Sequence, residues 1–527
     1  MRNPTPDRIH SRRWAILAVL SLSLLVVVVD NTIVNIALPT LVRQLHASTS
    51  ALQWVVDAYT LTMAGLLLTL GSLGDRIGRH RTLAAGLVVF GLGSGLAALS
   101  GSAGQLIACR ALMGLGAAAI MPATLSILTN VFTDQGERVK AIALWSAVSG
   151  LGIAIGPTLG GFLLEHFSWG SIFVVNLPIV AIALVAGRML VPPSAGSRPP
   201  ALDPVGAILS IAGLVGLVYA VIEAPSHGWL SPTTLGIGAL GLGVLSIWVA
   251  WELRSSHPMV DLRIFRNARF SAASVAVTLI FLALFGWLFL FTQQLQFVLG
   301  YNTLQAGIRA LPFALTIGMV APAAARLASR VGTKVVVASG LAVMAGGFGL
   351  LSTSTVGTPY LTLMVASVIL AAGMGLAMAP ATESIMGSLP PAQAGVGSAV
   401  NDTTRELGGA LGVAIMGSAA SSLFAGHLRP FLDGVPGTYA ASARASVGAA
   451  VTIGHHLPGP AGQLLVEGAR HAFISGADQA TLVALAAALL GAVVAAVFLP
   501  ARATGTAPRL RTAPEPGHLE LAQARAA

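Results

Sequence analysis

The sequence predicts an all-α, polytopic membrane protein. Of its 527 residues, 55% are hydrophobic and only 9% are charged, and the mean hydropathy is +0.82. So few charged residues cannot cover the surface of a soluble protein of this size. Apolar runs of about 20 residues, each long enough to cross about 30 Å of hydrocarbon, recur along the chain. The basic residues concentrate in alternate connections between these runs, as expected for loops on one side of a membrane.

The apolar runs give fourteen expected spans. The first begins at Trp14, behind Arg12 and Arg13. It is too long for a signal peptide and lacks a cleavage site, so we expect an uncleaved helix. The fourteen spans are 14–39, 52–73, 82–100, 104–131, 139–165, 169–190, 204–223, 233–252, 270–293, 304–327, 335–353, 358–388, 399–425 and 477–499.

The charge distribution predicts the orientation of the chain. Segments 76–81, 138–140, 263–269 and 326–334 are rich in arginine or lysine, whereas the intervening short loops hold almost none beyond Arg43. This bias places both termini in the cytoplasm and the protein in the cell membrane. The net charge of +10 therefore orients the chain, and nucleic acid is not an expected partner. The single cysteine, Cys109, excludes an internal disulfide and a cysteine metal cage, and we expect no metal or cofactor.

An internal repeat divides the chain into two halves. "PATLSI" at Pro122–Ile127 recurs as "PATESI" at Pro380–Ile385, 258 residues later (380 − 122). The loop "DRIGRHR" at 75–81 has a weaker echo in "SRVGTK" at 329–334. The alternative is chance similarity in a chain rich in alanine, glycine and leucine. Duplication predicts two parallel six-helix bundles with a substrate cavity between them.

Four segments follow from this division. Residues 1–190 form an N-terminal six-helix bundle, and 191–269 form a linker with two inserted transmembrane helices. Residues 270–500 form a C-terminal six-helix bundle with a long outer loop at 426–476, in which His455 and His456 are expected to be solvated rather than metal-bound. Residues 501–527 are expected to be a disordered cytoplasmic tail.

Five of the charged residues inside expected spans are candidates for function. Each would cost about 2.5–3.5 kcal/mol at a helix centre in lipid, so such residues normally face a cavity and serve ions or substrates. A purely structural ion pair is the alternative. Acids at span ends, namely Glu165, Glu223 and Glu252, are expected to be solvated by water or headgroups. The five candidates are Asp30, Asp57, Arg110, Asp402 and Glu406.

Small residues mark the fifth span. Gly152, Gly156 and Gly160 recur at four-residue spacing, which lets helices approach closely, and Pro157 bends the helix axis. "GLGIAIGPTLGG" superficially matches a dinucleotide-binding fingerprint, but no strand precedes it, so that match carries no function.

These motifs resemble those of the major facilitator superfamily, and specifically its 14-helix drug:proton antiporters, the QacA-like and EmrB-like multidrug exporters. "DNTIVNIALP" (Asp30–Pro39), "QWVVDAY" (Gln53–Tyr59) and "NDTTRELGGALGVA" (Asn401–Ala414) are similar to patterns of helices one, two and thirteen. "GSLGDRIGRHR" is similar to the loop motif between helices two and three, at Gly71, Asp75, Arg76, Gly78 and Arg79. "GIAIGPTLGG" is similar to the antiporter motif of helix five, at Gly152, Gly156, Pro157, Gly160 and Gly161.

The resemblance implies the major facilitator fold, with two six-helix bundles plus two extra central helices. It implies a non-enzymatic, monomeric, proton-coupled antiporter that exports lipophilic, cationic drugs or dyes by alternating access. Asp30 and Asp57 would bind a proton or a substrate cation in turn, and Arg110 would take part in proton coupling. Glu406, with Asp402, would supply a second site. The loop motif would hold the cytoplasmic side shut through Asp75.

Three other functions stay open. A dedicated exporter of an endogenous metabolite or antibiotic would share every feature above. A proton-coupled importer is disfavoured by the antiporter motif. A membrane-embedded enzyme would need a nucleophile–base pair or a metal cluster, and the sequence offers neither. No acid occurs between Asp261 and Glu383, so we expect singly charged cations to be handled better than dications.

Overall fold

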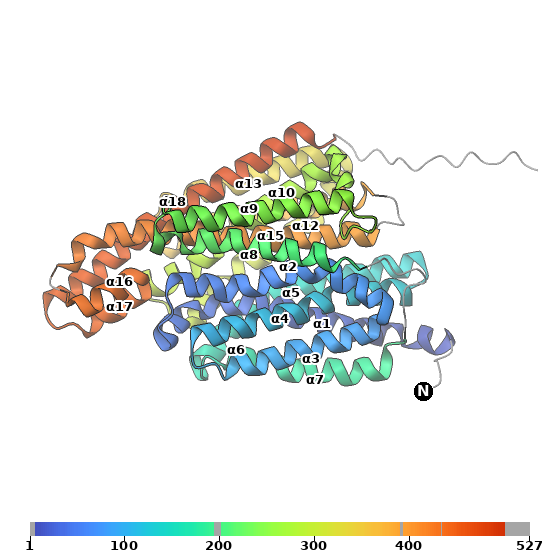
Figure 1. Ribbon diagram of the computed structural model, residues 1–527, viewed down its shortest axis with the longest axis horizontal. Helices are drawn as coiled ribbons and strands as arrows, with labels where there is room; N and C mark the ends of the chain where they lie inside the picture. The colour runs from blue at the N-terminus through green and yellow to red at the C-terminus, as the bar shows by residue number, and fades with distance from the viewer. Residues whose placement is uncertain (1–5, 194–201, 390–393, 434, 501–527) are drawn as a thin grey trace, which may run out of the picture.

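The computed structural model describes residues 6–193, 202–389, 394–433 and 435–500, and these are helical almost throughout (Figure 1). Within these ranges, thirteen helical segments are long and apolar enough to cross a membrane. The other expected span, 139–165, lies in the 32-residue helix α5 (Gln135–His166), several of whose side chains fall outside the description. The all-helical prediction is confirmed, and the count of fourteen spans stays a prediction. The expected tail, 501–527, lies outside the described residues.

Helices α1 to α7 pack on one another and occupy the lower part of Figure 1. α1 packs against α5 and α7, whereas α2 and α3 both pack against α4. The last expected span of this group is broken at Val175 into α6 and α7. The helices are α1 (Pro6–Leu45), α2 (Thr49–Ile77), α3 (Arg79–Ala98), α4 (Ala103–Val131), α5, α6 (Ser171–Val174) and α7 (Asn176–Leu190).

Helices α10 to α18 form the second group, in the upper part and at the left of Figure 1. α10 packs against α15 and α18, and α14 packs against α12 and α13. The elements are α10 (Ala268–Gln293), the π-helical turn η2 (Gln294–Val298), α11 (Thr303–Arg309), α12 (Leu311–Val331), α13 (Thr333–Leu351), α14 (Tyr360–Met386), α15 (Ala394–Leu428), η4 (Arg429–Leu432), α16 (Gly437–Ala445), α17 (Val447–His456) and α18 (Pro460–Phe498).

Helices α8 (Pro204–His227) and α9 (Pro232–Arg254) form a hairpin between the two groups in sequence, and the short η1 (Leu262–Arg266) follows them. α8 packs on α9 and also contacts α2 and α15. Val218 and Ile222 of α8 form a small apolar cluster with Leu61 of α2 and with Ala410 and Ala414 of α15. α8 therefore bridges the two groups along one side.

The segment expected to be a long outer loop is helical instead. It comprises the end of α15, η4, α16, α17 and the first turns of α18, which project at the left of Figure 1. Val447 and Val451, four residues apart, and Leu465 and Ala469, also four apart, are buried. Apolar residues at this spacing form one helix face that must be covered, so the segment folds. His455 and His456 are exposed, as expected.

The two groups share a local conformation where the sequence repeats. Gly78 ends α2 with φ of 108°, and Gly332 ends α12 with φ of 95°, so both lie in the region that favours glycine. They are 254 residues apart (332 − 78), which is also the offset between Arg76 and Arg330 in the two loops. Each glycine redirects the chain sharply into the next helix. Pro122 in α4 and Pro380 in α14 are matched in the same way.

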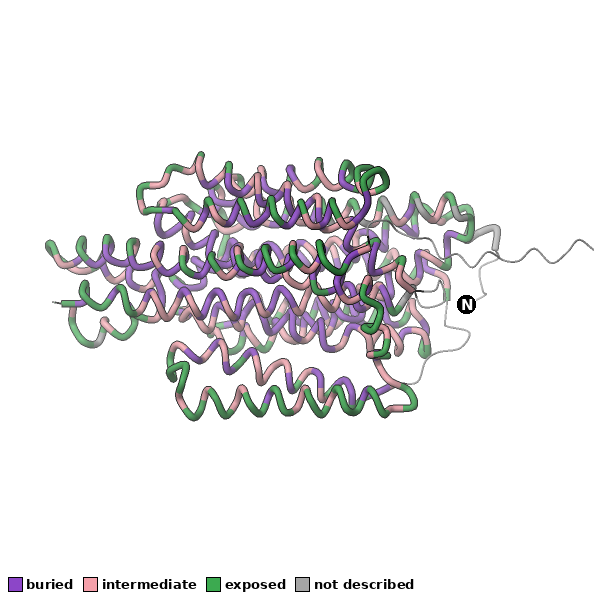
Figure 2. Tube along the Cα trace, turned by 90° about the horizontal axis from the view of Figure 1, so that it is seen from above, coloured by how far each residue is buried: buried purple, intermediate pink, exposed green. Residues whose placement is uncertain are grey.

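Burial follows the pattern of a protein in lipid. Buried positions run along the middle of the molecule, and exposed positions concentrate on the outer helices and at the ends (Figure 2). Large apolar side chains such as Leu92, Val185, Leu240 and Leu361 are exposed on those outer helices. A soluble monomer rarely exposes so much contiguous apolar surface. Hydrocarbon is therefore the solvent of these faces.

Candidate functional site

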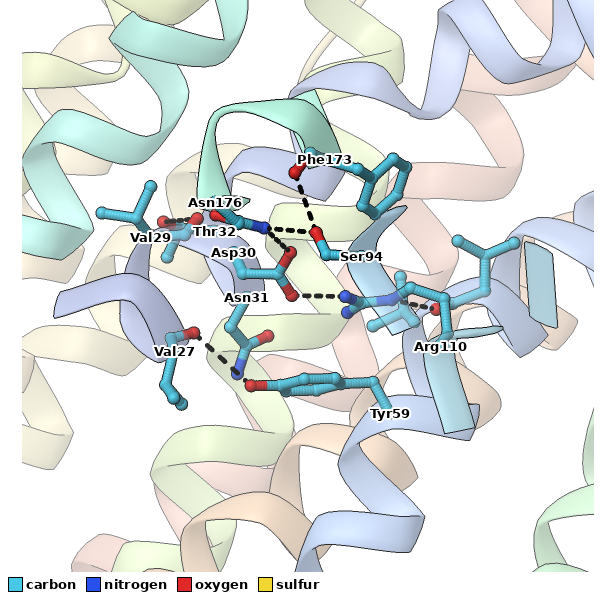
Figure 3. A network of polar contacts seen from close by, with 12 residues as sticks. Val27, Val29, Asp30, Asn31, Thr32, Tyr59, Ser94, Arg110, Phe173 and Asn176 are labelled. Carbon is cyan, nitrogen blue, oxygen red and sulfur yellow. Dashed lines mark hydrogen bonds and ion pairs between the residues drawn. The ribbon is translucent and has the colours of Figure 1, made fainter. Parts of the chain in front are cut away.

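The centre of the first helix group holds a buried ion pair. Asp30 lies on α1 and Arg110 on α4, and their side chains are 0% and 1% exposed. The Arg110 guanidinium donates a hydrogen bond from Nη1 to Oδ2 of Asp30 (Figure 3). α1 packs against α4, α5 and α7, and both charged side chains are enclosed in this conformation. Asp30 is enclosed in this conformation, and its expected contact with a central cavity stays a prediction.

Neutral polar groups complete this pair. Asn176 donates from Nδ2 to Oδ1 of Asp30 over 3.0 Å and to Oγ of Ser94, also over 3.0 Å. Arg110 donates from Nε to the Val55 carbonyl over 3.1 Å, and its guanidinium carbon lies 4.2 Å from the centre of the Tyr59 ring (Figure 3). Asn176 is the first residue of α7, and its side chain reaches Asp30 on α1. The buried charges are thus hydrogen-bonded on several sides, as such charges must be.

Sequence reasoning missed these supporting residues. Asn176, Ser94 and Tyr59 are uncharged, so a search for ionisable groups within spans passes over them. Asn176 offered one usable signal, because a carboxamide within the expected span 169–190 is costly unless it is paired.

Asp57 is buried without any pairing. Its side chain is 0% exposed, and neither of its carboxyl oxygens has a hydrogen-bond partner among the described residues. Its expected contact with a central cavity stays a prediction. One turn earlier on α2, Gln53 donates from Nε2 to the carbonyls of Val413 and Ala414 on α15, over 2.9 and 3.0 Å. Asp57 and Gln53 are four residues apart, so they share the α2 face directed towards the second helix group.

The second group contributes three charged residues within one stretch of α15, residues 402–406. Asp402 and Glu406 are half-buried, as is Arg405, which lies between them in sequence. Nη1 of Arg405 lies 3.9 Å from Oδ1 of Asp402. The structure therefore places Arg405 beside the two predicted acids. Its charge within an expected span was a signal that the sequence already carried.

The two groups touch at the end that contains the start of α2. There Gln296 of η2 donates to the Ile36 carbonyl over 3.0 Å. A Cβ atom added to Gly161 would lie 2.6 Å from the Thr303 carbonyl oxygen, so α5 and α11 are in close contact. A cavity of about 450 Å³ beside these contacts is lined by Arg43, Glu165 and other polar residues.

The glycines of the fifth expected span form a close interface with α1. A Cβ atom on Gly152 would lie 2.9 Å from Val28, and one on Gly160 would lie 2.6 Å from Ile33. A Cβ on Gly156 would overlap the Thr32 hydroxyl. The prediction that small residues let helices approach closely is confirmed at these positions. Pro157 lies within α5, and its carbonyl is packed against Gly307 of α11.

The loop motif lies at the opposite end from these contacts. Nε of Arg79 lies 2.7 Å from Oδ1 of Asp75, one helical turn away, and Arg79 also approaches the Ser126 carbonyl at 3.4 Å. Asp75 is thus paired within its own helix group in this conformation. Glu252 was expected to be solvated at a span end, and this expectation is wrong. Its side chain is 3% exposed and accepts hydrogen bonds from the Trp248 indole and the Val260 amide.

Comparison with known proteins decides the family. Residues 20–413 match the family model described as Major Facilitator Superfamily. The chain belongs to the major facilitator superfamily. Superfamily relatives include the multidrug efflux pump LfrA of Mycolicibacterium smegmatis, which is 36% identical over 499 residues, covering 94% of this chain and 98% of LfrA. The methyl viologen resistance protein SmvA of Salmonella typhimurium is 36% identical over 466 residues, or 88% and 93% of the two chains.

A third relative is the tetracenomycin C resistance and export protein of Streptomyces glaucescens, which is 32% identical over 496 residues, 92% of each chain. Among solved structures, an inward-facing, unoccupied bacterial homologue of the lysosomal transporter Spinster matches with a TM-score of 0.66 and 16% identity, over 93% of this chain and 98% of that one. That likeness shows the superfamily fold. The chain is therefore a multi-pass membrane transport protein and not an enzyme, and its relatives are drug and antibiotic efflux proteins.

Proposed function

We propose that this protein exports lipophilic, cationic drugs or dyes from the cytoplasm in exchange for protons, as a 14-helix drug:proton antiporter. Its two six-helix bundles would be α1–α7 and α10–α18, with the α8–α9 hairpin inserted between them and both termini in the cytoplasm. Proton coupling would involve Asp30, Asp57 and Arg110, with Glu406 and Asp402 facing the substrate.

The single observation that carries the proposal is the buried pairing of Asp30 with Arg110. A guanidinium keeps its charge in any protein environment, so it needs a partner at every stage of a transport cycle. A proton taken up by Asp30 would cancel the carboxylate charge and leave Arg110 to seek another acceptor. Protonation would thereby favour a different arrangement of α1 and α4, which is the coupling that an antiporter requires.

Asp57 supports the proposal from a second position. A charged carboxyl group without any partner is very costly in such surroundings. We expect Asp57 to carry a proton in the conformation described and to release it when the helix faces separate. Gln53, one turn away, would break its hydrogen bonds to α15 in the same movement, because the outer contacts must open for export.

The names of the relatives support the substrate class. LfrA is named for multidrug efflux and SmvA for resistance to methyl viologen, which is an organic dication, so the relatives' names support cationic substrates without supporting the expected preference for a single charge. The alternative of a dedicated exporter of an endogenous product is favoured by the tetracenomycin C export protein. We therefore include a neutral, polycyclic antibiotic in the test.

The test is transport by purified protein in proteoliposomes with an imposed pH gradient. The parent should move ethidium against its gradient as protons flow the other way, and Asp30→Asn and Asp57→Asn should each abolish the dependence on the proton gradient. Asp433→Asn removes an exposed acid and should leave transport intact. Proton-driven flux of the neutral antibiotic but not of ethidium would establish the alternative. Full coupling in both buried-acid variants would refute the assigned residues.

A further inference from the structure

Arg405 lies between two acids in the sequence of α15, and all three side chains are partly exposed. The side chains of Arg405 and Asp402 are 25% and 19% exposed, and Glu406 is also half-buried. By contrast, Arg110 is 1% exposed. The α15 charges are therefore accessible in this conformation, whereas the Asp30–Arg110 pair is enclosed.

The guanidinium of Arg405 is held loosely by several groups. Nη2 donates to the Thr382 hydroxyl over 3.1 Å, and Nη1 lies 3.9 Å from Asp402. Nε is buried and has no hydrogen-bond partner among the described residues. The guanidinium carbon lies 5.6 Å from the centre of the Phe281 ring, at the limit of a cation–π contact. Arg405 is thus less enclosed than Arg110, which is 1% exposed and donates to the Asp30 carboxylate and to the Val55 carbonyl.

The same surface has the features of a site for a planar cation. Phe281 and Phe285 are stacked with their ring centres 5.9 Å apart, and both are partly exposed. Gly408 and Gly409 allow α15 to approach them, since a Cβ atom on Gly409 would already touch the Phe285 ring at 3.4 Å. Aromatic faces attract organic cations, and nearby carboxylates attract them further. Arg405 occupies one of these aromatic faces and neutralises one of these acids.

We propose that Arg405 acts as a tethered internal cation that limits this site to one positive charge on the substrate. With both acids ionised, Asp402, Arg405 and Glu406 together carry one negative charge. A monocation neutralises that charge, whereas a second positive charge meets the guanidinium without a matching acid. This inference rests on the proposed function and adds to it a residue that selects substrates by charge.

The experiment compares two dyes that share one ring system, the monocation ethidium and the dication propidium. The propidium-to-ethidium ratio of transport rates should rise at least about tenfold in Arg405→Gln, because a like charge beside the second positive centre is removed. Arg405→Lys keeps the charge and should keep the parent ratio. Arg309→Gln is the matched control, since Arg309 also lies over an aromatic ring, at 3.8 Å from Tyr301, but at the other end of the second group.

Asp402→Asn tests the opposite change. It makes the group of Asp402, Arg405 and Glu406 neutral, so the KM for ethidium should rise about tenfold. Arg405→Gln makes the group more negative, so it should lower the KM for ethidium or leave it unchanged. Dissociation constants of both dyes, measured by fluorescence with detergent-purified protein, give the same ratio without transport. They therefore separate failure of this inference from failure of proton-driven export.

Two outcomes would overturn the role of Arg405. One is an unchanged dye ratio in folded Arg405→Gln, in both flux and binding. The other is an equal change of the ratio in Arg405→Lys and Arg405→Gln, since that would assign the effect to packing rather than charge. If Arg405→Gln does not fold, the binding of the two dyes to Arg405→Lys and Asp402→Asn decides. The inference then requires that Arg405→Lys keeps the parent's propidium-to-ethidium binding ratio and that Asp402→Asn changes it. Any other result overturns the inference.

Discussion

Replacement of Asp30 by asparagine should be strongly destabilising, and the structure sets the scale of the effect. The new side chain has nearly the same shape and can still bond to Asn176. The charge that balances Arg110 is lost, however, and Arg110 is 1% exposed with no access to water. Removal of one member of a buried ion pair typically costs about 3–5 kcal/mol, because the other charge stays buried and uncompensated. We expect the free energy of unfolding to fall by that amount.

The double variant Asp30→Asn/Arg110→Met should recover much of this loss. With both charges absent, no uncompensated group is left, and an apolar side chain of similar length fills the space of the guanidinium stem. Asp75→Asn provides the control. Its partner Arg79 is at a similar distance but the Asp75 side chain is 29% exposed, so the change should cost about 1 kcal/mol or less.

The measurement is the denaturant dependence of folding in mixed micelles, followed by the fluorescence of the eight tryptophans. The reasoning would be refuted if Asp30→Asn were no more destabilising than Asp75→Asn. A double variant as unstable as Asp30→Asn alone would also contradict it, because the loss could not then arise from an unpaired guanidinium.

Two further results are expected. Gly156→Ala should lower the unfolding free energy by about 1–3 kcal/mol, because the added methyl group overlaps the Thr32 hydroxyl. Gly236→Ala is the control, because Gly236 has open space around it and the change should not lower the unfolding free energy. Comparable losses at both sites would contradict this packing. Hydrogen bonds from Arg13 hold the pKa of Glu137 below its usual 4.5, so their stabilising effect should be present above that pH and be lost as pH falls through the depressed pKa. Arg13→Gln should therefore lower the unfolding temperature at neutral pH and have no effect in strong acid, and a pH-independent difference would exclude this cause.

The helices and the candidate charges could be predicted because lipid imposes strict rules on sequence. A span must be apolar over about 20 residues, so Asp30, Asp57 and Arg110 stand out wherever they occur. The loop at 75–81 has its echo at 329–334, and the structure shows that Gly78 and Gly332 in these loops adopt similar positive φ angles. The segment 426–476 was misjudged because its helices are short and only mildly apolar, and they are stabilised by packing on the ends of other helices.

The pairing of Asp30 with Arg110 could not be derived from spacing, since the two residues are 80 positions apart and on different helices. Nor could the sequence show that Asn176 would turn towards the same carboxylate, or that Asp57 would be left without a partner. The sequence also could not show how far each charged side chain would be exposed. Asp30 is enclosed and Asp402 is partly exposed because of how neighbouring helices pack, not because of their local sequence.

The sequence by itself determined that the chain lies in a membrane and which residues are costly there, because hydrocarbon penalises each such residue one at a time. The tertiary structure decided which charges neutralise one another, which carboxyl group has no partner, and which faces of α2, α8 and α15 meet. Those facts depend on distances of a few ångströms between helices far apart in the chain, and electrostatic and hydrogen-bonding energies change steeply over such distances.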